Sequence, residues 1–141
     1  MIVDDDKSLL TSLAEILERE GYNVDTVETG GQAIERTKKQ YYHLALIDIK
    51  LPDMEGTEIL KAMKDTVPKM VKIIVTGYPS LENAIAAVNK GADGYIVKPI
   101  EVEKLLGMMK THLDRQEEER KYSEEKVKDF IETRSKELTS I

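Results

Sequence analysis

The feature that most constrains the fold of this chain is the alternation of short apolar runs with stretches of helical periodicity. Residues 43–47 and 71–75 are nearly all apolar, which is typical of strands buried on both faces of a parallel sheet. Around them, apolar side chains recur every three or four residues, as on one face of an amphipathic helix. Five strand–helix repeats predict an α/β fold. We expect a five-stranded parallel sheet in the order 2-1-3-4-5, with helices on both faces.

The ends of the predicted elements are marked by particular residues. Asp6, Thr29 and Ser80 are placed to cap helices, and Gln32 stands at capping-box spacing from Thr29, which predicts a helix over about residues 30–40. Gly21 closes the first helix. The remaining strands are expected at residues 2–3, 22–27 and 94–97.

The C-terminal part of the chain departs from this pattern. From Asp114 to Asp129, 12 of 16 residues are charged, so no continuous apolar stripe is available for burial. Apolar residues then return at heptad-compatible positions, at Val127, Ile131, Leu138 and Ile141, although Arg134 interrupts the seam. We therefore predict a globular domain over residues 1–112, and a charged helical extension or linker over 113–141. The extension is either a solvated helix or a coiled coil.

Composition excludes several classes of function. The net charge of −6 argues against nucleic-acid binding by this chain, because affinity for a phosphate backbone needs clustered Lys and Arg. No apolar run approaches the roughly 20 residues that span a bilayer, so no membrane interaction is expected. The absence of cysteine excludes disulfides and thiolate metal sites, and it fits a cytoplasmic protein.

Carboxylates follow two of the predicted strands. Asp4 and Asp5 come after the first strand, and Asp48 comes after the third. In an open parallel sheet, ligands bind beyond the carboxyl ends of the strands, where the strand order reverses. Three carboxylates gathered there repel one another unless a cation lies between them. Oxygen ligands without His or Cys favour a hard ion, and Mg²⁺ is the natural candidate.

Two further strand ends carry groups that complement these carboxylates. Thr76 offers a hydroxyl after the fourth strand, and Lys98 offers an ammonium after the fifth. Together with a metal, these groups could neutralise the oxygens of a phosphoryl group during its transfer. Asp48 is then the expected nucleophile and forms an aspartyl phosphate. No general base is needed, since a carboxylate is already ionised at neutral pH.

These motifs resemble the receiver domains of bacterial and archaeal response regulators, across roughly residues 1–112. Four stretches carry the resemblance in the right order and spacing, and they are Ile2-Val3-Asp4-Asp5-Asp6, Leu46-Ile47-Asp48-Ile49-Lys50-Leu51-Pro52-Asp53-Met54-Glu55-Gly56, Val75-Thr76-Gly77 and Gly91-Ala92-Asp93-Gly94-Tyr95-Ile96-Val97-Lys98-Pro99. The resemblance implies a phosphorylation switch that controls an output and takes its phosphoryl group from a histidine kinase or phosphotransfer protein. It implies catalysis of the chain's own phosphorylation and dephosphorylation only.

The resemblance also implies roles for individual residues. Asp48 is similar to the phosphoacceptor, and the metal ligands it implies are Asp4, Asp5, Asp48 and the backbone carbonyl of Lys50. Thr76 and Tyr95 correspond to the switch pair, whose movement remodels the face formed by the fourth helix, fifth strand and fifth helix. Lys98 corresponds to the phosphate-pairing cation, and its bond to Pro99 is expected to be cis. A homodimer through the remodelled face and the tail is a further expectation.

Two features depart from the family pattern. The first strand is short, which puts the stability of that edge of the site in question. Lys50 and Tyr78 are bulky at the positions that flank the phosphoryl pocket, and our hypothesis is that they hinder an attacking water molecule.

Two other functions are compatible with parts of this pattern. A receiver-like interaction module that is never phosphorylated would normally have lost one of the five site residues, and none is lost here. A phosphatase with an aspartyl-phosphate intermediate generally needs an acid–base carboxylate close after the nucleophile and a cap over the site. Position 50 holds Lys, and the chain has no insertion large enough for a cap.

Overall fold

The computed structural model describes residues 1–63 and 65–139, and it confirms the predicted α/β architecture. Five parallel strands form one sheet in the order β2-β1-β3-β4-β5. The elements in chain order are β1 (Ile2–Val3), α1 (Lys7–Arg19), β2 (Thr26–Val27), α2 (Gly30–Lys39), β3 (Leu44–Asp48), α3 (Gly56–Ala62), β4 (Val71–Thr76), α4 (Leu81–Asn89), β5 (Gly94–Val97) and α5 (Val102–Thr139).

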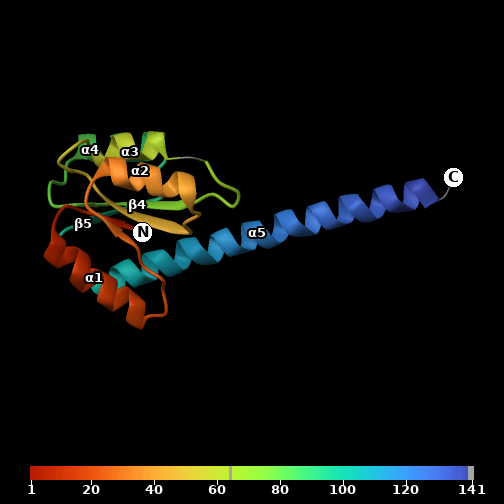
Figure 1. The fold of residues 1–141 in the computed structure, drawn as a ribbon, viewed down its shortest axis with the longest axis horizontal. Coiled ribbons are helices and arrows are strands. Elements are labelled where there is room, and N and C mark those ends of the chain that lie inside the picture. Colours follow the sequence, from red (N-terminus) through yellow and green to blue (C-terminus); the bar gives the residue numbers. More distant parts are fainter. Residues whose placement is uncertain (64, 140–141) are drawn as a thin grey trace.

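The helices cover the sheet in two layers. Figure 1 shows α2, α3 and α4 on one face of the sheet, and α1 with the first part of α5 on the other. Each face has its own apolar core. Side chains such as Ile47, Ile59 and Ala87 pack on the first face, and Leu13 and Leu105 pack on the second. Burial on both faces explains why β3 and β4 are almost continuously apolar.

The helix starts follow the predicted capping pattern. The carboxylate of Asp6 accepts hydrogen bonds from the backbone N–H groups of Ser8 and Leu9. The hydroxyls of Thr29 and Ser80 cap α2 and α4 in the same way. The Gln32 side chain does reach back, but it accepts from the N–H of Glu28 (2.9 Å), one residue before the cap. A reciprocal bond to Thr29 itself is therefore absent from this helix start.

The second strand is shorter than the predicted span of residues 22–27. Only Thr26 and Val27 pair with the sheet, because β1 offers only Ile2 and Val3 as partners. Tyr22 and Val24 instead pack against the apolar core formed with α1 and α5. Their apolar character thus reflects core packing and not strand pairing.

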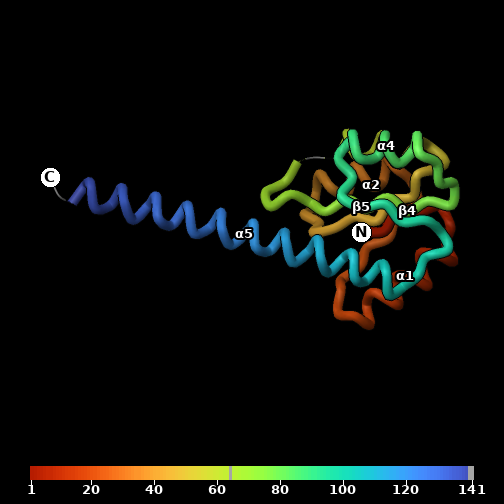
Figure 2. Tube along the Cα trace, turned by 180° about the vertical axis from the view of Figure 1, so that it is seen from behind, coloured from red at the N-terminus to blue at the C-terminus, as the bar shows by residue number. Residues whose placement is uncertain are grey.

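The last helix continues far beyond the domain. Figures 1 and 2 show α5 leaving the sheet and extending as a single straight rod. It passes through the predicted boundary after residue 112 without a break, so that boundary stays a prediction. Ile141, the last expected heptad residue, lies outside the described residues. None of the described helices is both long and apolar enough to cross a membrane.

Gln116 is the last residue of α5 that is buried against the domain. Its side-chain amide donates hydrogen bonds to the carbonyls of His43 (2.8 Å) and Lys69 (2.9 Å). The His43 carbonyl immediately precedes β3, and the Lys69 carbonyl lies two residues before β4. One side chain therefore connects the helix to two neighbouring strands. Gln116 thereby fixes the point at which the tail departs from the domain.

We expect Gln116→Ala to lower the free energy of unfolding by about 1–3 kcal/mol, since it removes two hydrogen bonds in a partly buried site. The Lys69 carbonyl loses its side-chain donor, whereas the His43 carbonyl still accepts from the N–H of Val71. Urea denaturation followed by circular dichroism measures this loss. Arg115→Ala is the matched control, because Arg115 is exposed on the same helix turn and should change stability little. Equal stability of the two variants would contradict the proposed anchoring.

Candidate functional site

The strand register brings the predicted carboxylates together. Val3 pairs with Ile47, so Asp4 and Asp48 lie side by side where β1 and β3 end. Carboxylate oxygens of Asp4, Asp5 and Asp48 all lie within 4.8 Å of one another. Asp4 and Asp48 are buried, with 2% and 7% of their surface exposed, whereas Asp5 is exposed.

Lys98 reaches this cluster from the end of β5. Its Nζ lies 2.8 Å from Oδ2 of Asp4 and 3.4 Å from Oδ2 of Asp48. The backbone N–H of Lys98 donates to the carbonyl of Thr76, which aligns the ends of β4 and β5. The Lys98–Pro99 bond is cis, as predicted.

The electrostatics of the cluster follow from burial and charge. Burial, and next the negative charge of Asp4, raise the pKa of the Asp48 carboxyl above its ordinary value, although Lys98 opposes the shift. Burial alone would lower the pKa of the Lys98 ammonium. The hydrogen bonds and charges of Asp4 and Asp48 outweigh that effect, so the pKa of Lys98 is raised. Asp48 is thus a carboxylate held in an environment that disfavours its own negative charge.

The predicted switch residues lie on neighbouring strands. Thr76 is fully buried at the end of β4, and its hydroxyl accepts a hydrogen bond from the N–H of Tyr78 (2.9 Å). Tyr95 is half-buried against the core, and its hydroxyl is buried without a hydrogen-bond partner among the described residues. A buried phenol hydroxyl without a partner costs free energy. Packing against the core, and not a hydrogen bond, therefore holds this side chain in place.

Lys50 and Tyr78 meet above the strand ends. The Lys50 ammonium lies 4.2 Å from the centre of the Tyr78 ring, a cation–π contact. The backbone of each residue contacts the site as well: the N–H of Lys50 faces Asp48 at 3.4 Å, and Tyr78 contacts Thr76. Both positions named in the sequence analysis therefore border the carboxylate cluster.

The loop after Asp48 is fixed by Gly56 and Asp53. A Cβ on Gly56 would lie 2.2 Å from the Asp48 carbonyl oxygen, so only glycine allows this approach. Asp53 accepts hydrogen bonds from the N–H groups of Gly30 and Gly31, both at 2.9 Å, and these bonds lower the pKa of its carboxyl. Both residues lie within the motif that carries the family resemblance. The motif does not show their contacts, because Gly56 approaches the backbone of Asp48, and Asp53 bonds to glycines more than 20 positions earlier in the chain.

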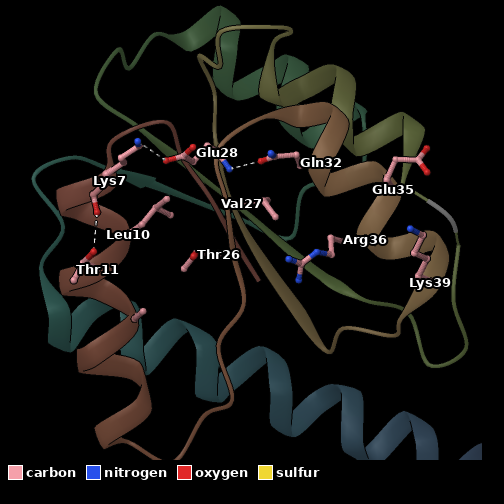
Figure 3. Close-up of a pocket in the computed structure, with 11 residues that line it drawn as sticks. Lys7, Leu10, Thr11, Thr26, Val27, Glu28, Gln32, Glu35, Arg36 and Lys39 are labelled. Carbon is pink, nitrogen blue, oxygen red and sulfur yellow. Dashed lines mark hydrogen bonds and ion pairs between the residues drawn. The ribbon is translucent and has the colours of Figure 1, made fainter.

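A separate groove of about 670 Å³ lies between α1 and α2, over the edge strand β2 (Figure 3). Leu10 and Val27 contribute apolar surface, and Lys7 pairs with Glu28 at 3.8 Å. None of the predicted site residues lines this groove. The candidate site is therefore confined to the carboxyl ends of the strands.

The donor set suits a hard divalent cation. All three clustered side chains offer carboxylate oxygens, and no His or Cys is among them. The contribution of the Lys50 carbonyl stays a prediction. A doubly wound sheet that carries an acidic cluster, a hydroxyl and a lysine at its strand ends defines a class of protein that handles phosphoryl groups at a carboxylate.

Comparisons with known proteins identify the family within that class. The family model of the response regulator receiver domain matches residues 1–110. A CheY-like receiver domain protein from Methanospirillum hungatei JF-1 is 50% identical, covers 84% of this chain and 94% of its own, and superposes with a TM-score of 0.79. The chain belongs to the response regulator receiver family.

Two further relatives show the range of the family. A Burkholderia pseudomallei response regulator, solved with a phosphorylated aspartic acid, a calcium ion and citrate, is 29% identical, covering 84% of this chain and 69% of that one, with a TM-score of 0.73. The transcriptional regulatory protein ZraR of Escherichia coli K12 is 37% identical over 105 residues. That match covers 74% of this chain and 24% of ZraR, so this chain spans about a quarter of that relative's length.

Proposed function

We propose that this receiver takes a phosphoryl group onto Asp48 from a histidine kinase or phosphotransfer protein, and that Mg²⁺ binds beside it. The observation that carries the proposal is the placement of Asp48, buried between Asp4 and Lys98 at the point where the strand order reverses. The phosphorylated aspartic acid reported for the Burkholderia relative is consistent with this chemistry.

In the proposed transfer, a carboxylate oxygen of Asp48 attacks the phosphorus of a phosphohistidine. The O–P bond forms while the N–P bond breaks, and the electron pair of that bond returns to the imidazole of the donor. Lys98 lies 3.4 Å from Asp48 and is positioned to pair with an oxygen of the incoming phosphoryl group. The Thr76 hydroxyl would turn from the N–H of Tyr78 toward another of these oxygens.

We assign the metal to Asp4, Asp5, Asp48 and the carbonyl of Lys50. When bound, Mg²⁺ supplies positive charge that offsets the repulsion among the carboxylates and the charge of the phosphoryl oxygens. Asp4 and Asp48 are held in place by burial, and Asp4 also accepts a hydrogen bond from the N–H of Asp6 (2.9 Å). The exposed Asp5 leaves the cation open to solvent and to the donor.

The output surface we propose is the face formed by α4, β5 and the start of α5. Its exposed apolar side chains are Leu81, Ile85, Val88 and Val97. Thr76 pairs with Val97 on β5, and Tyr95 lies two residues before Val97 on the same strand, with no hydrogen-bond partner for its hydroxyl among the described residues. A change at Thr76 would therefore reach this face through β5. We propose that the chain catalyses only its own phosphorylation and dephosphorylation. We also propose that the receiver domain spans residues 1–112 and that the protein is cytoplasmic.

Beryllofluoride, which mimics an aspartyl phosphate, tests the switch without a kinase. In the presence of Mg²⁺ we expect the amide NMR signals of Asp48, Thr76, Tyr95 and the α4 residues to shift together. Omission of Mg²⁺ should abolish the shifts. Signals that move only around Asp4 and Asp5 would show metal binding without the proposed switch.

The contact between Lys50 and Tyr78 predicts slow loss of the phosphoryl group. We expect the double variant Lys50→Asn with Tyr78→Ala to dephosphorylate roughly tenfold faster, equivalent to about 1.4 kcal/mol of activation free energy, because water reaches the phosphorus more easily. The decay of the phosphorylated protein, followed by intact mass, measures the rate. Lys61→Asn, on the exposed surface of α3, is the control. A double variant that decays no faster than the parent contradicts the shielding role.

A further inference from the structure

The tail of α5 is a helix without a partner in the single chain. Residues 117–139 project beyond the sheet (Figures 1 and 2), and all except Arg120 are exposed. Five large apolar side chains lie on this segment, and they are Tyr122, Val127, Phe130, Ile131 and Leu138. In proteins most helical stability comes from packing of an apolar face, and the apolar side chains of this segment are exposed in the single chain.

A groove of about 960 Å³ runs along one side of this tail. Arg120, Glu124, Val127 and Ile131 line it at spacings of four, three and four residues, which places them on one face of the helix. The opposite wall is the loop before β4, and it includes Val67, which is 92% exposed. An apolar helix face and an exposed valine thus border the same open groove.

The charges on this helix face specify how a second helix would lie against it. The seam continues from Ile131 to Arg134 and Leu138 at the same heptad spacing. In a parallel pair of identical helices, each seam residue faces its own copy. Glu124 would face Glu124 and Arg134 would face Arg134, so like charges would oppose each other in two layers.

The antiparallel arrangement removes this conflict. When two tails cross at Asp129, Val127 faces Ile131 of the second copy, and Ile131 faces Val127. The next layer on each side pairs Glu124 with Arg134 of the second copy. Glu124 and Arg134 are 66% and 65% exposed, so both stay accessible while they keep their bonds to Arg120 and Glu137 in their own helix.

The same register explains the position of Val67. Arg120 faces Leu138 of the second copy. Leu138 lies about 27 Å along the helix axis from Arg120 of its own chain. Arg120 and Val67 line the same groove, so the C-terminal end of the second helix comes to rest beside Val67. The aliphatic stem of Arg120 can cover Leu138 while its guanidinium stays with Glu117 and Glu124.

We propose that two copies of this chain associate through their tails as an antiparallel two-helix coiled coil, seated in the groove beside Val67. The two receiver domains then lie at opposite ends of the pair, and the α4–β5–α5 face of each stays free. This association does not depend on phosphorylation of Asp48. It is therefore separable from the proposed function.

Charge reversal in the full-length chain tests the helix direction. We expect Glu124→Arg and Arg134→Glu each to raise the dissociation constant of the dimer by at least roughly tenfold, because each places like charges in two layers. The double variant should restore the parent value. Sedimentation equilibrium measures the constant, circular dichroism verifies helix content, and Glu125→Arg, on the exposed side of the same turn, is the control with equal net charge.

The outcomes separate the alternatives. A parallel pair has like-charge layers in the parent and in every variant, so single variants that dimerise as tightly as the parent would overturn the antiparallel register. A double variant that stays as weak as the single variants would overturn the pairing of Glu124 with Arg134. A weak but specific dimer is populated at a protein concentration of about 100 µM. A parent chain that stays monomeric at that concentration overturns the proposal altogether. A dimer that survives Ile131→Asp overturns the assignment of the interface to the tail.

Disulfide trapping gives an independent readout, because the chain contains no cysteine. An equimolar mixture of Val127→Cys and Ile131→Cys chains is expected to form the mixed disulfide faster than either variant forms a disulfide with itself. Faster self-linkage of Val127→Cys would indicate the parallel arrangement and contradict the proposal.

Discussion

Asp48→Asn is expected to abolish covalent phosphorylation and, at the same time, to make the metal-free protein more stable. The carboxylate is the only group at this position that can act as the nucleophile, so the loss of the adduct is complete. The gain in stability follows from the raised pKa of Asp48, since burial and the charge of Asp4 disfavour its ionised form. We expect the free energy of unfolding to rise by about 1 kcal/mol at neutral pH, a typical gain for a single stabilising substitution.

The pH dependence of this gain has a definite sign. A carboxyl whose folded pKa lies above its unfolded value binds more protons in the folded state, so the stability of the parent falls as pH rises through that window. The advantage of Asp48→Asn is therefore full above the raised pKa of Asp48 and shrinks as pH falls through it. Urea denaturation at a series of pH values measures the difference between parent and variant.

Magnesium provides the control for this interpretation. At a concentration tenfold above its dissociation constant, a ligand that binds only the folded state stabilises it by about 1.4 kcal/mol. We expect that gain in the parent and little of it in Asp48→Asn, so Mg²⁺ should reverse the order of stability. A variant that is less stable than the metal-free parent at neutral pH contradicts the electrostatic account of the site.

Gly56→Ala is expected to lower the free energy of unfolding by about 2–4 kcal/mol, the range of severe overpacking against backbone. The new Cβ would lie 2.2 Å from the Asp48 carbonyl oxygen and 2.9 Å from the Cα of Ile49. The loop or the end of β3 must move to relieve this contact. Since the moved carbonyl belongs to Asp48, the rate of phosphorylation by acetyl phosphate should fall as well.

Gly107→Ala is the matched control for that substitution. Gly107 lies within α5, and no other described atom lies within 4 Å of a Cβ built on it, apart from its own helix backbone and chain neighbours. Replacement of a helical glycine by alanine in open space should stabilise the protein by up to about 1 kcal/mol. Opposite signs for the two variants in thermal unfolding would identify the Gly56 effect as steric. A Gly56→Ala protein as stable as its parent would contradict the close approach.

Much of the fold was predictable because the strongest signals in the sequence come from burial. The apolar runs at β3 and β4 and the capping residues Asp6 and Thr29 determine element type and direction locally. The gathering of Asp4 and Asp48 was predictable for a related reason, since parallel strands end at one edge of the sheet. Their individual roles stay predictions, carried by the resemblance and by the geometry.

The features that were missed depend on contacts between distant parts of the chain. Gln116 sits in a highly charged stretch, and nothing nearby indicates that its amide meets the carbonyls of His43 and Lys69. The apolar residues of α4 were visible in the sequence, but only Ala87 is fully buried, while Ile85 and Val88 face solvent. Periodicity identifies an apolar face without saying whether the sheet or a partner covers it.

Intact-mass analysis after incubation with acetyl phosphate and Mg²⁺ tests the central claim most directly. We predict one added phosphoryl group on Asp48, absent when EDTA removes the metal and absent from Asp48→Asn. A folded parent chain that gains no phosphoryl group, or gains it equally in Asp48→Asn, contradicts the assignment of Asp48 as the phosphoacceptor.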